Sequence, residues 1–77
     1  MDMKNLVEVL LFTTPEPLTQ TRFNQIIQDE NTVELGTIIE KLNLEYKESG
    51  KGLNIQKIGG GYQFLSLPEY HVFIERL

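Results

Sequence analysis

The sequence contains no cysteine and only one histidine among its 77 residues. Without cysteine, disulfide bonds and thiolate chemistry are excluded, and a reducing compartment is permitted. His71 has no second histidine with which to share a metal ion, and a single histidine does not define a Ser/His/Asp set. We interpret His71 as a solvated surface residue. We expect no enzymatic activity, no metal and no cofactor.

Long hydrophobic runs are also missing. Residues 6–12 form the longest apolar stretch, which is far too short to span a bilayer and contains Glu8. The first four residues lack the basic region of a signal peptide. We therefore expect a soluble, cytoplasmic protein. Its length predicts one domain over residues 1–77, with marginal stability because a small domain buries little of its surface.

Basic residues are few. Seven lysines and arginines face eleven acidic residues, which gives a net charge of −4. The basic residues are scattered along the chain, whereas a domain that binds phosphates usually has a basic face. This balance argues mildly against nucleic acid as the main partner, although a local basic patch is still possible.

Three segments show the periodicity of amphipathic helices. The first includes apolar residues 6–11 and ends before Pro15, which cannot donate a helical hydrogen bond. The second begins after Leu18, with the hydroxyl of Thr19 as the expected N-cap. Its apolar residues are Phe23, Ile26 and Ile27.

The third helix is expected over residues 32–49. Asn31 with Glu34 three residues later fits a capping box, and Thr32 is the competing cap. Gly50 is a natural end to the helix. The apolar face is the most regular in the chain and consists of Leu35, Ile38, Ile39, Leu42 and Tyr46.

Beyond Gly52 the periodicity changes to two. Residues 53–58 and 62–67 flank a run of three glycines, which predicts a β-hairpin. A phosphate-binding loop is disfavoured because a strand, not a helix, follows the glycines. From Glu69 onward a further helix is expected, with an apolar stripe that ends at Leu77 without a C-cap. Either the chain continues or this stripe packs on something outside it. The stripe consists of Tyr70, Phe73, Ile74 and Leu77.

Three helices followed by a hairpin are typical of a winged helix. We therefore predict an α+β fold with a three-helix helix-turn-helix core, a two-stranded β wing and a C-terminal helix. Several short pieces, in this order and spacing, resemble the segregation and condensation protein B family. These pieces are Leu10-Leu11-Phe12, Glu16-Pro17-Leu18, Leu53-Asn54-Ile55, Gly60-Gly61-Tyr62-Gln63-Phe64, Pro68-Glu69-Tyr70 and Arg76-Leu77.

The resemblance implies the first of two tandem winged-helix domains in a non-enzymatic subunit of the bacterial SMC complex. It implies a homodimer that binds segregation and condensation protein A, a kleisin, and through it SMC. The implied role is chromosome condensation and partition, in association with the nucleoid. Aromatic and aliphatic side chains of the hairpin and last helix are candidate protein contacts, with core packing as the competing explanation. They are Tyr62, Phe64, Leu65, Leu67, Tyr70 and Phe73.

The alternative function is a winged-helix DNA-binding transcriptional regulator. In that class the second helix of the motif enters the major groove. Here the helix over residues 32–49 carries four acidic residues and only two lysines. Phosphates would repel this excess of negative charge. Lys51 and Lys57 near the wing are candidates for weak contact with a DNA backbone. Their competing role is to keep a hairpin edge soluble.

Overall fold

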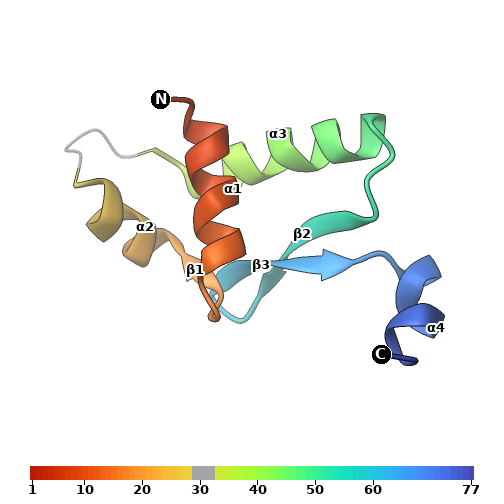
Figure 1. Cartoon of the computed structure of the whole chain (residues 1–77). Coiled ribbons are helices and arrows are strands. Elements are labelled where there is room, and N and C mark those ends of the chain that lie inside the picture. Colours follow the sequence, from red (N-terminus) through yellow and green to blue (C-terminus); the bar gives the residue numbers. More distant parts are fainter. Residues whose placement is uncertain (29–32) are drawn as a thin grey trace.

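Helix α3 (Leu35–Glu48) supplies five of the ten core residues found in the described part of the chain. A computed structural model describes residues 1–28 and 33–77. Figure 1 shows α3 crossing α1 (Met3–Thr13) on one side of the sheet, with the C-terminal segment at the far end of the molecule. All five residues of the predicted apolar face are buried: Leu35, Ile38, Ile39, Leu42 and Tyr46.

Two shorter helices complete the helical layer. Helix α1 (Met3–Thr13) buries Val7 and Leu11, and α2 (Gln20–Ile27) buries Phe23 completely. The predicted N-cap of α2 is confirmed, because the Arg22 amide donates to the Thr19 hydroxyl over 3.0 Å. Within the described ranges, no helix is both long and apolar enough to cross a membrane.

The sheet has three antiparallel strands in the order β1-β3-β2. Strands β2 (Leu53–Ile58) and β3 (Gly61–Ser66) form the predicted hairpin, and β1 (Leu18–Thr19) adds a third strand to the predicted two-stranded wing. Strand β1 has only two residues and therefore shows no alternation.

Gly61 explains how such a short strand can pair. Thr19 lies opposite Gly61 in the register, and a Cβ atom on Gly61 would come within 2.9 Å of the Pro17 backbone. A larger residue would push β1 away from β3. The glycine run therefore serves two purposes, since Gly59 (φ 60°) makes the turn and Gly61 admits β1.

The predicted start of α3 is wrong. The helix begins at Leu35, with Glu34 as an N-cap whose side chain makes no capping bond. The cap comes from α2: the Leu35 amide donates to Gln20 Oε1 over 2.7 Å, and Gln20 Nε2 donates to the Val33 carbonyl over 2.8 Å. The predicted caps at positions 31 and 32 lie outside the described residues. The predicted end is confirmed by Gly50, whose φ is 69°.

Asn43 attaches the hairpin to α3. Its Nδ2 donates to the Ile55 carbonyl and its Oδ1 accepts from the Ile55 amide, both over 2.8 Å. Strand β2 is an edge of the sheet, so the Asn43 amide occupies the position of a neighbouring strand. The backbone of a buried residue is thereby satisfied without a fourth strand.

The predicted C-terminal helix is present but shorter than expected. A 3₁₀ turn, η1 (Pro68–Tyr70), leads into α4 (His71–Ile74). His71 is exposed, as predicted.

Replacing Asn43 by alanine is expected to lower the free energy of unfolding by about 1–3 kcal/mol, because both polar groups of the Ile55 backbone lose their partner. Urea denaturation measures the change. Leu44→Ala is the matched control, since the neighbouring Leu44 is 57% exposed and its loss should change the free energy by less than about 0.5 kcal/mol. Equal effects of the two substitutions would contradict this role for Asn43.

Candidate functional site

An apolar groove of about 640 Å³ runs between the C-terminal half of α1 and the hairpin. Helix α1 supplies one wall, and the start of β2 together with the middle of β3 supplies the other. The apolar lining includes Val9, Phe12, Pro15, Leu53 and Phe64. Such a groove suits the burial of apolar side chains from a ligand or partner and offers few groups for chemistry.

Phe12 is the most exposed aromatic residue of this groove. It is 85% exposed, and Val9 on the same wall is 59% exposed. The sequence assigned the apolar face of α1 to residues 6–11 and did not single out Phe12 as a candidate contact. Val9 and Phe12 are three residues apart and fall beside the buried positions 7 and 11. Apolar residues that lie beside the buried face of a helix, and not on it, are the sequence signal that could have identified Val9 and Phe12 as exposed contacts.

A hydrogen-bonded pair lies in the groove. The hydroxyl of Tyr46 donates to the Glu8 carboxylate, and Tyr46 itself is buried. Burial raises the pKa of the Tyr46 phenol well above its usual range, and the bond to Glu8 and its negative charge raise it further. This hydrogen bond links α1, which carries Glu8, to α3, which carries Tyr46.

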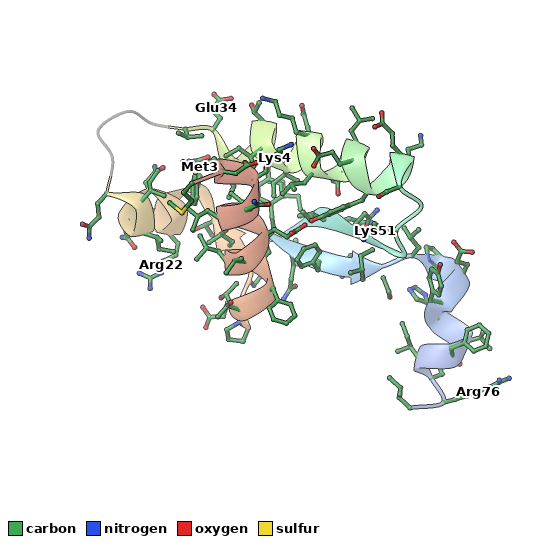
Figure 2. The ribbon with its side chains drawn as sticks, turned by 45° about the horizontal axis from the view of Figure 1, so that its top comes forward. Met3, Lys4, Arg22, Glu34, Lys51 and Arg76 are labelled. Atoms are coloured by element: carbon green, nitrogen blue, oxygen red, sulfur yellow. The ribbon has the colours of Figure 1, made fainter. Side chains whose placement is uncertain are left out.

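A second apolar surface lies on the C-terminal segment. We call Tyr70, Val72, Phe73 and Ile74 the α4 face; Phe73 is 62% exposed and the others between 41% and 48%. Figure 2 shows the C-terminal segment, where Arg76 is labelled, at a distance from α1 and α2. Contiguous exposed apolar side chains of this kind mark interaction sites in small proteins.

The six candidate contacts of the hairpin and last helix fall into two groups. Tyr62 and Phe64 are half-buried and pack against the core, and Leu65 and Leu67 are half-buried as well. Phe64 also borders the groove. Only Tyr70 and Phe73 are exposed, both in the α4 face.

Known proteins identify the family to which this architecture belongs. The family described as segregation and condensation complex subunit ScpB matches residues 5–77. The chain belongs to the ScpB family. Segregation and condensation protein B of Symbiobacterium thermophilum is 36% identical over 75 residues, and the Coxiella burnetii homolog is 31% identical over 77 residues. The chain spans about a third of these relatives' length, 33% and 36%, while 96% of the chain is covered in both.

Solved structures share the fold. A conserved hypothetical protein from Chlorobium tepidum matches with a TM-score of 0.82 and 29% identity, over 95% of this chain and 48% of that chain. A dimer of an ScpB N-terminal domain complexed with an ScpA peptide matches with a TM-score of 0.77 and 23% identity, over 96% and 85% respectively. The predicted winged-helix, α+β fold is confirmed.

The α3 surface of this ScpB-family chain is mainly acidic. Helix α3 and its N-cap carry four exposed glutamates: Glu34, Glu40, Glu45 and Glu48. Glu45 pairs with Lys4 of α1, which raises the pKa of the Lys4 ammonium, and Figure 2 shows Lys4 directed toward α3. Lys51 is exposed two residues before β2, and Lys57 is exposed near the end of that strand. In residues 1–28 and 33–77, no cluster of three potential metal ligands occurs.

The hydroxyl of Tyr46 gives a prediction on pH. Its pKa is higher in the folded protein than in the unfolded chain, where it is about 10. The phenol therefore stabilises the fold below about pH 10, and this contribution is lost as the pH rises above that value. We expect Tyr46→Phe to be less stable than the wild type near neutral pH, with a difference that shrinks in alkali.

Denaturant unfolding at about pH 8 and about pH 11 measures this difference. Glu8→Gln serves as the control, because it keeps the side-chain size but removes the negative charge beside the phenol. A stability difference between wild type and Tyr46→Phe that is independent of pH would rule out the proposed linkage.

Proposed function

We propose that this chain is the N-terminal, non-enzymatic binding module of a segregation and condensation subunit. It forms a homodimer, binds the kleisin ScpA and through it joins the SMC complex that condenses and partitions the chromosome. Membership of the ScpB family supports the role, and an ScpB N-terminal domain with the same fold is a dimer complexed with an ScpA peptide. A cytoplasmic, nucleoid-associated location follows from that role.

The observation that carries the proposal is the pair of open apolar surfaces. The groove holds Val9 and Phe12 at its rim, and the α4 face holds Phe73 and Ile74. Among the described residues, ten apolar side chains form the buried core, and these four lie outside it at the surface. An interface centred on aromatic anchors has the composition expected of polypeptide recognition.

The acidic α3 surface argues against DNA as the main partner. The helix that would enter the major groove, together with its N-cap, carries four exposed glutamates against two exposed lysines, Lys41 and Lys47, so its net charge opposes the phosphates. Two exposed lysines, Lys51 and Lys57, provide at most weak and salt-sensitive contacts. We therefore propose no strong direct binding to nucleic acid.

The groove and the α4 face are tested by Phe12→Ser and Phe73→Ser. We expect each substitution to weaken either self-association or binding of the ScpA of the same organism by at least tenfold, because an exposed aromatic anchor is lost. Light scattering and calorimetry measure the two associations. Leu44→Ser is the matched control, since Leu44 is an exposed apolar residue on the outer side of α3.

A single titration separates the two functional classes. We expect no shift of duplex DNA at physiological salt in an electrophoretic assay with the wild-type chain. Affinity for DNA that is strong at low salt and falls steeply as salt is added would instead favour the transcriptional-regulator alternative.

The outcome of the two phenylalanine substitutions is read separately. Unchanged association of both Phe12→Ser and Phe73→Ser would remove support from the two apolar surfaces.

A further inference from the structure

The link between the sheet and α4 is short and fixed at its base. Leu67 follows β3 directly, and its amide donates to the Gly52 carbonyl over 2.9 Å, which extends the hairpin by one pair. Pro68 comes next with a restricted backbone, and the Tyr70 amide closes the turn onto the Leu67 carbonyl over 3.1 Å. Little freedom remains in the backbone up to this point.

The ring of Tyr70 rests on Gly52. A Cβ atom built on Gly52 would lie 2.8 Å from Cε2, 3.0 Å from Cζ and 3.3 Å from Oη of Tyr70. The first distance is shorter than any ordinary carbon–carbon contact, so the ring could not stay in place beside a methyl group. A side chain at position 52 would therefore displace the Tyr70 ring from its place on the hairpin.

Backbone conformation does not account for this glycine. Gly50 and Gly59 have positive φ values, which explains their identity, but Gly52 does not. Gly60 in the hairpin turn also lacks a positive φ, and a Cβ atom there would meet open space. Gly52 therefore differs from the neighbouring glycines in the ring that it accommodates.

Helix α4 itself has few anchors. Its backbone bonds run within the segment, from Glu75 to His71 and from Arg76 to Phe73. Figure 1 shows α4 beyond the end of the sheet, clear of α1 and α2. In the described part of the chain, the element packed most closely on α4 is η1, which contains Tyr70.

We infer that the Tyr70–Gly52 contact sets the direction in which α4 leaves the domain and so positions the α4 face for its partner. Gly52 and Tyr70 are positioning residues, and Phe73 and Ile74 make the contact. The inference rests on the proposed function, because orientation matters to association only if the α4 face binds. The orientation of α4 in the isolated chain is a separate, measurable property.

Spin labels can measure that orientation directly because the chain has no native cysteine. Labels are placed at Glu40→Cys on α3 and Glu75→Cys after α4, both exposed positions, for double electron–electron resonance. We call the labelled protein without further substitutions the parent, and we expect it to give one narrow distance distribution. Adding Gly52→Ala or Tyr70→Ala should broaden or shift that distribution. Gly60→Ala is the matched control and should resemble the parent.

The double variant tests whether Gly52 acts through Tyr70. Once the ring is gone, a methyl group at position 52 has nothing to displace, so Gly52→Ala should add no change in the Tyr70→Ala background. Additive changes would overturn the inference, as would a parent-like distribution in Gly52→Ala or Tyr70→Ala. Circular dichroism identifies a variant that fails to fold, and in that case the other single variant decides the question.

The measurements of self-association and of ScpA binding are then repeated with the same variants. We expect Gly52→Ala and Tyr70→Ala each to weaken association about fivefold or more, again without additivity. Wild-type affinity with an altered α4 direction would overturn the positioning role. Absence of any association in the parent, with the resonance results as expected, would instead defeat the proposed function and leave the α4 anchor established.

Discussion

The bidentate bond between Asn43 and the Ile55 backbone connects the helical layer to the β wing, and the surfaces of the molecule depend on it. Strand β2 starts at Leu53, which forms a wall of the groove, and Gly52 just before it supports Tyr70. A shift of β2 along α3 would therefore move the groove wall and the base of α4 together. One side-chain amide, used in place of a fourth strand, thus fixes both apolar surfaces.

Glycines without side chains make the other essential close approaches. Gly61 lets β1 reach the sheet beside Pro17, and Gly52 admits the ring of Tyr70. The two contacts lie at opposite ends of β3, at its first residue and just beyond its last. One joins the connector after α1 to the hairpin, and the other joins the hairpin to α4. Packing at these points is decided by the absence of a methyl group, a requirement separate from backbone conformation.

Helix periodicity and turn chemistry were readable in the sequence because they are local. Thr19 caps α2 as expected, and all five predicted residues of α3 are buried. The predicted start of α3 was wrong because the cap of the Leu35 amide is Gln20, fifteen residues before Leu35 in the sequence. Strand β1 was missed because two residues show no period, and their partner is Gly61. The stripe of α4 predicted a helix, but periodicity alone does not distinguish a stripe that faces the core from one that faces a partner.

The open surfaces also bear on the stability of the domain. A chain of this size buries a limited fraction of its surface, so its folding free energy is expected to be small. Phe12 and Phe73 contribute little to the buried core while they remain 85% and 62% exposed. A partner that covers them binds the folded state and stabilises it by mass action. The proposed association through these residues would therefore also strengthen the fold.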